Sequence, residues 1–179
     1  MAKNSVKSAP FFVRANIDCA ATSGTYDQAP IDLGFAVDAL GATIVRLHSV
    51  QADFSTQGAS NGLPYPAAAG NWGQVSYQLT TQSQTDLVYA SDKSLVTSGK
   101  LAVAMDTNND PVLLSAESNR IDLSLNEGYL IGVETMYLGI IGTLSSGAFI
   151  DEPRVDVILE FTVESMTSAK AIALSLSQQ

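Results

Sequence analysis

Residues 154–164 read Arg-Val-Asp-Val-Ile-Leu-Glu-Phe-Thr-Val-Glu, and this stretch decides the fold class. Its odd-numbered positions, from Val155 to Val163, are all apolar, and its even-numbered positions are polar apart from Ile158. A helix would instead repeat its apolar positions about every 3.6 residues. Because successive side chains of a strand point to opposite faces, the stretch predicts a β-strand with one buried face.

The same alternation recurs along most of the chain, which predicts about eight strands. Within the N-terminal half, the apolar positions change phase between Leu47 and Val50, and a change of phase inside a strand predicts a β-bulge. A polar segment, Asp106–Pro111, separates two short strands and predicts a hairpin. Besides residues 154–164, the predicted strands are Phe11–Ile17, Thr43–Phe54, Val75–Leu79, Leu101–Met105, Val112–Leu114, Ile121–Leu125 and Tyr129–Tyr137.

Helical signals are confined to two short segments. Leu33–Leu40, followed by Gly41, predicts one short helix. The tail Thr167–Gln179 fits both a helix and a strand, and its alanines favour a helix. We therefore predict an all-β antiparallel sandwich with one or two short helices. The expected division is an N-terminal arm, residues 1–10, and a single domain, residues 11–179.

Charge limits the partners of the chain. Its 179 residues carry a net charge of −9, and the nine Lys and Arg residues are scattered. A nucleic-acid-binding surface needs clustered cations, so we expect no direct contact with nucleic acid. Only Lys3 and Lys7 lie close together. Contact of the arm with an anionic membrane surface therefore stays an alternative to a solvated terminus.

The residues that carry most enzyme chemistry are nearly absent. The chain has one histidine, His48, placed mid-strand, where a structural hydrogen bond is the expected role. Its one cysteine, Cys19, follows an apolar segment and is expected in the core. No nucleophile elbow, phosphate loop or dinucleotide fingerprint occurs. We expect no catalytic residue, no cofactor and no enzymatic activity. Without an apolar leader, we also expect synthesis in a cytoplasm rather than secretion by a signal peptide.

One spacing resembles a calcium loop. Asp106, Asn108 and Asp110, with Glu117 eleven positions after the first, copy the ligand spacing of an EF-hand. The sixth position of that loop should be glycine, whereas this chain has Pro111, whose φ is fixed at a negative value. The favoured interpretation is a hairpin tip rich in turn residues. Looser calcium binding by Asp106, Asn108 and Asp110 remains the alternative.

A long segment without strand pattern, Ser55–Gly73, contains two aromatic residues, Tyr65 and Trp72. Segments this long are often functional in a compact domain. Large rings supply contact area at low entropic cost, so Tyr65 and Trp72 are candidate interface residues. The alternative is that both rings fold back onto their own sheet. Only 15% of the residues are charged, and a surface polar through hydroxyls and amides suits contact with other protein.

The two ends of the chain carry a family resemblance. Residues 1–14, MAKNSVKSAPFFVR, run directly into a strand, and residues 155–164 run into a small-residue tail ending Ser177-Gln178-Gln179. These features resemble virion proteins of marine or archaeal viruses and, more broadly, single jelly-roll major capsid proteins of icosahedral viruses. The resemblance implies a single jelly roll that assembles with itself into a viral capsid or similar shell, with other virion proteins as partners. It also implies location in the virion after synthesis in the host cytoplasm.

The net negative charge of this chain differs from the pattern of capsid proteins that bind their genome, which usually carry a basic arm. In an internal-membrane virus a lipid vesicle separates shell from genome, which would remove the need for such an arm. The competing hypothesis is a non-enzymatic binding module, a lectin-like or fibre-tip sandwich. There Trp72, Tyr65 and Tyr26 would stack on sugar rings and the Asp106 loop would hold calcium.

Overall fold

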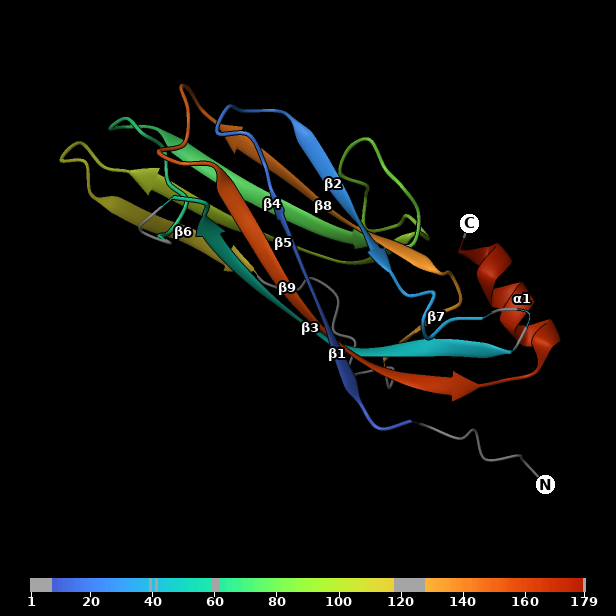
Figure 1. The fold of residues 1–179 in the computed structure, drawn as a ribbon. Coiled ribbons are helices and arrows are strands. Elements are labelled where there is room, and N and C mark those ends of the chain that lie inside the picture. Colours follow the sequence, from blue (N-terminus) through green and yellow to red (C-terminus); the bar gives the residue numbers. More distant parts are fainter. Residues whose placement is uncertain (1–7, 39, 41, 59–61, 118–127, 179) are drawn as a thin grey trace.

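The computed structural model describes residues 8–38, 40, 42–58, 62–117 and 128–178. Two antiparallel sheets pack face to face, and one short helix lies at an end of the sandwich (Figure 1). The described strands are β1 (Phe11–Asp18), β2 (Tyr26–Asp32), β3 (Thr43–Thr56), β4 (Trp72–Thr80), β5 (Leu95–Met105), β6 (Pro111–Glu117), β7 (Tyr129–Ile131), β8 (Thr135–Leu144) and β9 (Pro153–Ser165), and the helix is α1 (Ser168–Ser177).

The order of the strands is that of a jelly roll. One sheet has the order β1-β9-β3-β7 and the other β2-β8-β4-β5-β6. The first strand pairs with the last, β2 with β8, β3 with β7 and β4 with β5, all antiparallel. Such nested pairing is what a long antiparallel ribbon gives when it is rolled into two sheets. Strand β6 adds one further strand to an edge. The predicted all-β single jelly roll is confirmed.

The core lies between the sheets and is built from the apolar face of each strand. In β9 the residues Val155, Val157, Leu159 and Phe161 are buried, as their alternation predicts. Phe161 stacks on Phe11 of β1, with ring centroids 5.7 Å apart. Burial of one such side chain contributes about 1.5–3 kcal/mol, so these inward rows supply most of the driving force.

The predicted bulge is confirmed at a specific residue. Pairing of β3 with β9 shifts register between Leu47 and Ser49, so His48 is the extra residue. Leu47 and Val50 are both buried, although their spacing would put them on opposite faces of a regular strand. The bulge therefore keeps both halves of this long strand facing the core.

The helix predicted for Leu33–Leu40 is wrong. Where the chain is described, this segment makes a single turn, with the amides of Ala36 and Val37 both donating to the Leu33 carbonyl. Leu33 and Val37 are buried in the core, and Asp38 then pairs with Thr43 at the start of β3. The chain must turn into the next strand at once, which leaves no room for a second helical turn.

The single strand predicted for Tyr129–Tyr137 is also wrong. The stretch forms two strands, because β7 belongs to the four-stranded sheet and β8 to the five-stranded one. Residues 132–134 carry the chain across, and the phase inverts there: Ile131 is buried before the crossing, and Met136 and Leu138 are buried after it.

Strand β2 has no counterpart among the predicted strands. Its sequence, Tyr-Asp-Gln-Ala-Pro-Ile-Asp, contains Pro30 and two carboxylates, which are poor strand formers. It is an edge strand, where a residue without an amide proton is tolerated. The predicted strand Ile121–Leu125 and residues 1–7 of the arm lie outside the described residues. Ser8 extends the β1–β9 pairing, since its amide donates to the Val163 carbonyl at 3.1 Å.

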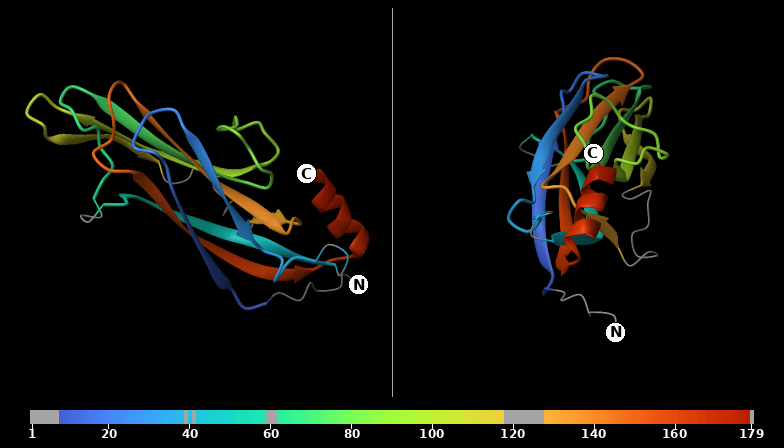
Figure 2. Two further views of the ribbon diagram at one scale, coloured as in Figure 1. Left: turned by 45° about the horizontal axis from the view of Figure 1, so that its top comes forward. Right: turned by 90° about the vertical axis from the view of Figure 1, so that its right-hand side faces the viewer.

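Helix α1 confirms the helical alternative for the tail, and its final turn joins the two sheets. Gln178 is 4% exposed. Its side chain accepts from the Gly132 amide at 2.9 Å and donates to the Leu130 carbonyl at 2.7 Å. Its carbonyl accepts from Thr81 Oγ1 at 3.0 Å. Figure 2 shows that the connections β3–β4, β5–β6 and β8–β9 lie at the end of the sandwich opposite α1, which we call the loop end.

Replacing Gln178 with Ala is expected to lower the free energy of unfolding by about 2 kcal/mol, because an amide and a carbonyl lose their buried partner. Urea denaturation followed by circular dichroism measures the change. Leu176, on the same helix, is 65% exposed, so Leu176→Ala is the matched control and should change stability by less than about 0.5 kcal/mol. Equal effects of the two substitutions would contradict the role given to Gln178.

Candidate functional site

The outer face of the five-stranded sheet carries an exposed apolar row near the loop end. Trp72 lies opposite Ala104 on β5, and Ala104 lies opposite Val112 on β6. All three point away from the core, because their neighbours Gly73 and Val103 are the buried ones. At the edge of the sheet the next two residues of β6, Leu113 and Leu114, are also exposed, although Leu113 pairs with Val103 and so lies on the core-facing side. We call Trp72, Ala104, Val112, Leu113 and Leu114 the β6 surface.

The side chains of the β6 surface are open to solvent. Trp72 is 45%, Val112 47%, Leu113 56% and Leu114 57% exposed. Leu114 is the extra residue of a second bulge, because the β5–β6 register shifts between Ala102 and Val103. Large contiguous apolar patches are rare on monomeric proteins and mark interaction sites.

Charge is sparse around the β6 surface. On the outward side of β5 and β6, Lys100 lies opposite Glu117, and their charged atoms are 3.9 Å apart. Both side chains are partly exposed, and such a pair contributes little to stability. Between this pair and the apolar row, the outward positions are Ala102, Ser115 and Gln74. A partner protein could therefore cover the face without burying an unpaired charge.

Trp72 was expected within a loop, and the structure places it at the first position of β4. Its carbonyl accepts from the Ser145 amide at 2.9 Å, which fixes the row against the β8–β9 connection. Of the expected loop Ser55–Gly73, the first two residues belong to β3 and the last two to β4.

Tyr65, the second candidate interface residue, lies in the β3–β4 connection at the loop end. Its carbonyl accepts from the Ile150 amide at 3.0 Å, and the next residue, Pro66, bridges to Phe149. Tyr65 is half-buried, while Ile150 and Leu63 are exposed. The backbone at Tyr65 is thus held by the neighbouring connection, and its role at an interface stays a prediction.

Tyr26, the third candidate for stacking on sugar rings, was expected in a loop, and the structure places it at the first position of β2. Its hydroxyl accepts from Gln78 Nε2 at 2.9 Å. The ring lies over Gly139, where an added Cβ would be 2.6 Å from the ring carbon Cζ. Burial raises the pKa of the Tyr26 hydroxyl. Tyr26 is therefore a packing residue of the sheet, which weakens the binding-module hypothesis.

The Asp106–Asp110 segment forms the predicted hairpin tip. Asp106 Oδ1 accepts from the amides of Asn108 and Asp110, at 2.7 and 2.9 Å. The hydrogen bond from Asp110 and those from Asn108 lower the pKa of the Asp106 carboxyl. Asn109 has a φ of +65°, the conformation that such a turn requires. Among the described residues, no group of three His, Cys, Asp or Glu side chains is placed to share a metal ion. Calcium binding by Asp106, Asn108 and Asp110 stays a prediction.

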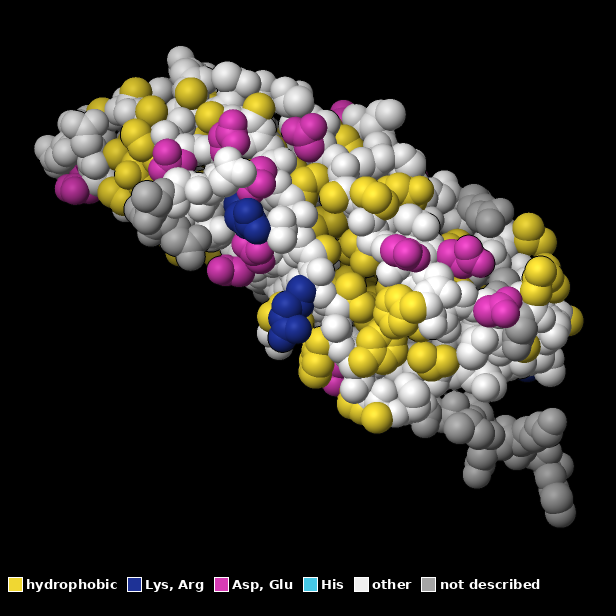
Figure 3. All heavy atoms as spheres, viewed as in Figure 1, with side chains coloured by type: hydrophobic (Ala, Val, Ile, Leu, Met, Phe, Trp, Pro, Cys, Tyr) yellow, Lys and Arg dark blue, Asp and Glu magenta, His cyan; other side chains and the backbone are white. Residues whose placement is uncertain are grey.

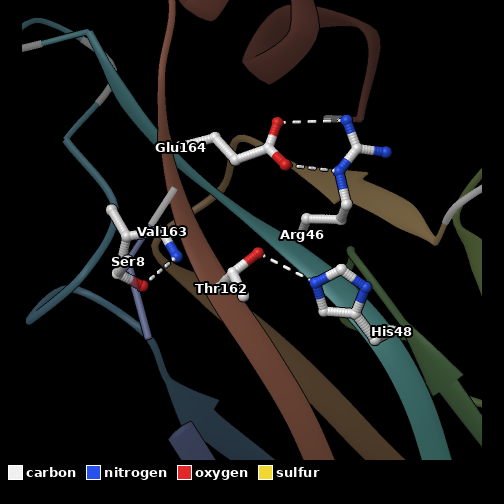
Figure 4. Close-up of polar contacts among 6 residues, drawn as sticks. All are labelled: Ser8, Arg46, His48, Thr162, Val163 and Glu164. Carbon is white, nitrogen blue, oxygen red and sulfur yellow. Dashed lines mark hydrogen bonds and ion pairs between the residues drawn. The ribbon is translucent and has the colours of Figure 1, made fainter. Parts of the chain in front are cut away.

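His48 belongs to a row of polar contacts between β3 and β9 (Figure 4). Its Nε2 lies 2.8 Å from Thr162 Oγ1. Two residues along each strand, Arg46 donates from Nε and Nη2 to the two carboxylate oxygens of Glu164, at 2.6 and 3.0 Å. Both charged side chains are largely buried. Figure 4 also shows the Val163 amide donating to Ser8 Oγ. These contacts join strands, as the structural role expected for His48 requires.

Cys19 is 2% exposed and packs within the hydrophobic core. Burial, reinforced by the negative charges of Asp27, Asp18 and Glu152, raises the pKa of its thiol to about 12. A thiol must lose its proton to act as a nucleophile. Cys19 is therefore a core residue, as expected.

Stability is expected to fall as the pH rises above about 9, because the unfolded chain releases the Cys19 proton near its ordinary pKa of 9.0 and the folded chain holds it to about 12. The loss reaches about 2 kcal/mol at pH 10.5, at about 1.4 kcal/mol per pH unit. Burial of Tyr77 acts in the same direction above pH 10. Urea denaturation at several pH values measures the slope. Cys19→Ala should flatten it between pH 9 and 10, and an unchanged slope would contradict this account.

No family model and no curated protein matches the sequence. Among solved structures, the chain is similar to a chain of Desmodium yellow mottle tymovirus, with 11% identity and a TM-score of 0.40, covering 92% of this chain and 90% of that one. It is also similar to the VP1 of Merkel cell polyomavirus, solved as an unassembled pentamer, with 8% identity and a TM-score of 0.43, covering 93% and 98%. A third is the VP1 of trichodysplasia spinulosa-associated polyomavirus, with 10% identity and a TM-score of 0.40, covering 86% and 95%.

Within the described part of the chain, no helix has the length and hydropathy of a membrane span.

Proposed function

We propose that this chain is a structural subunit that assembles with copies of itself into a viral capsid or a similar protein shell. One observation carries the proposal: three consecutive apolar residues of the edge strand β6 are exposed, and beside them Trp72 lies exposed on a sheet face with little charge. Fold alone does not decide function, and a jelly roll serves many roles. An apolar sheet face at an unpaired edge is unfavourable in a monomer, because it promotes aggregation. In a shell the same face is buried.

The proposed role is structural rather than enzymatic. Its support is that the single histidine is engaged by Thr162 and the single cysteine is a buried thiol with a raised pKa. We place the protein in the virion, beside other virion proteins, after synthesis in the host cytoplasm. The net charge of −9 supports a shell whose inner face does not bind nucleic acid. The arm would then meet a membrane surface, as in an internal-membrane virus of a marine or archaeal host.

Size-exclusion chromatography with light scattering, followed by negative-stain microscopy, tests the proposal. We expect the mass to rise with protein concentration and regular rings, sheets or shells to appear. A monomer at every concentration and salt would overturn the proposal. Trp72→Glu, which places a charge at the β4 end of the row, should abolish the particles while leaving the circular dichroism spectrum unchanged.

Crosslinking of purified particles tests the absence of genome contact separately. We expect crosslinks between copies of this chain and none in stoichiometric amount to nucleic acid. Stoichiometric crosslinks to nucleic acid would overturn the membrane-facing arrangement and leave the shell role standing.

A further inference from the structure

A groove lies at the α1 end of the sandwich, where α1 and the β4–β5 connection approach each other (Figure 1). Its volume is about 590 Å³, and small-molecule sites occupy roughly 300–1,000 Å³. Its lining is polar apart from Gly132 and Val133. We call it the α1 groove and define it by the polar side chains that the argument uses, Thr81, Ser83, Glu134, Thr135, Tyr137 and Ser175.

One side of the α1 groove is held in place by hydrogen bonds from outside it. The carbonyl of Gln178, directly after α1, accepts from Thr81 Oγ1 at 3.0 Å and from Gln82 Nε2 at 3.1 Å. The Ser83 hydroxyl accepts from the Gln28 side chain of β2. A site whose groups are already ordered loses less conformational entropy when a ligand binds.

On the other side, polar side chains are left for a ligand. Within the described residues, four of them make no hydrogen bond and no ion pair, namely Glu134, Thr135, Tyr137 and Ser175. Thr135 and Tyr137 lie on the outer side of β8, because their neighbours Met136 and Leu138 are buried. A hydroxyl both donates and accepts, whereas a carboxylate only accepts. The groove therefore suits a ligand that donates and accepts in the same molecule.

The charge of the α1 groove excludes two classes of ligand. No Lys, Arg or His lines it, and its one charged side chain is the carboxylate of Glu134, so an anion would be repelled. Figure 3 shows acidic side chains prevailing over basic ones on one face of the molecule, which adds to that repulsion. Among the residues that the structure describes, no three His, Cys, Asp or Glu side chains are placed to share a metal ion.

We infer that the α1 groove binds a neutral saccharide of one or two rings. Two neighbouring hydroxyls of a sugar would donate to the Glu134 carboxylate, and others would meet the hydroxyls of Thr135 and Ser175. The C–H groups of a sugar ring would pack on the electron-rich face of Tyr137. An organic cation would also pair with Glu134, but it uses only acceptors and leaves the hydroxyl protons unmatched. The inference goes beyond the structural role and does not depend on assembly.

Saturation-transfer NMR with the full chain tests the inference. The probes are the methyl glycosides of glucose, galactose, mannose, fucose and N-acetylglucosamine, with a sialic acid glycoside and spermidine as the anionic and cationic comparisons. We expect transfer to at least one neutral glycoside, with a Kd in the range of about 1–10 mM, and none to the sialic acid glycoside. No transfer to any neutral glycoside would overturn the inference.

Two variants locate the binding. Glu134→Gln keeps the shape of an exposed side chain and should weaken binding by about 10-fold, because charge-assisted hydrogen bonds are lost. Tyr137→Leu removes the ring and should weaken binding by a similar factor, whereas Tyr137→Phe should retain most of the affinity. Glu152→Gln, an equally conservative change of an exposed carboxylate at the loop end, is the matched control and should bind as the wild type does.

The remaining outcomes are distinct. Binding that is unchanged in Glu134→Gln places the sugar elsewhere and overturns the inference. Transfer to spermidine alone, lost in Glu134→Gln, assigns the groove to an organic cation and also overturns it. Trp72 lies at the opposite end of the molecule, so Glu134→Gln should assemble as the wild type does. A failure of sugar binding therefore leaves the shell role standing, and a monomeric wild type leaves the sugar test valid.

Discussion

Glu164→Ala is expected to lower the free energy of unfolding by about 3 kcal/mol, because it removes both hydrogen bonds that the Arg46 guanidinium makes to this carboxylate. The pair connects the neighbouring strands β3 and β9, and the side chains of Arg46 and Glu164 are only 15% and 7% exposed. In so buried a site the Arg46 guanidinium loses these two hydrogen bonds without regaining full hydration. For a chain of this length the loss corresponds to a fall of roughly 10 °C in melting temperature.

A matched pair of controls separates charge from packing. Glu164→Gln keeps the volume and one oxygen acceptor, so it should cost about half as much. Asp156→Ala removes a carboxylate from the same outer face, where Arg154 lies 3.1 Å away and the Asp156 side chain is 45% exposed. That change should cost less than about 1 kcal/mol. Melting at one protein concentration measures all three, and equal losses for Glu164→Ala and Asp156→Ala would contradict the buried-pair account.

The alternation of apolar and polar residues determined how much of the fold could be predicted from the sequence. It shows which side chains share a face, and this was enough for β9, β4 and the bulge in β3. It does not show which sheet a strand joins. Residues 129–137 were therefore predicted as one strand, although the chain passes from one sheet to the other at residues 132–134. β2 was hidden for another reason, since Pro30 and its carboxylates are acceptable only at an edge. Edge position is a property of the whole fold.

The candidate site shows the same limit. Trp72 was identified from its residue type, but its neighbours in the row, Ala104 and Val112, belong to the β5–β6 hairpin, which is distant from Trp72 in the sequence. A signal for the β6 surface did exist: three consecutive apolar residues in a strand cannot all face one core. The exposure of Leu113 required the structure, because it depends on β6 lying at the edge of the larger sheet.

One closure of the sandwich depends on a glycine that periodicity does not reveal. Gly128, just before β7, has a φ of +98°, and an added Cβ there would lie 2.5 Å from the Leu47 carbonyl oxygen. Leu47 belongs to β3 and pairs with Tyr129 of β7. Backbone cannot retreat as a flexible side chain does, so a methyl group at Gly128 must push β7 away from β3. Gly24 has a similar φ, +89°, with nothing within 4 Å of an added Cβ.

Gly128→Ala should therefore destabilise the fold by about 3–4 kcal/mol, the sum of backbone strain and the displaced strand, whereas Gly24→Ala should cost about 1–2 kcal/mol from strain alone. Urea denaturation of both variants measures the difference, and similar losses would show that the close approach to Leu47 carries no cost. β7 is also the strand that Gln178 holds, through the Leu130 carbonyl. Once β7 has been pushed from β3, the contact of Gln178 has less left to stabilise. The double variant Gly128→Ala with Gln178→Ala should consequently lose less stability than the sum of the two single variants, and strict additivity would mean that the two ends of β7 are held independently.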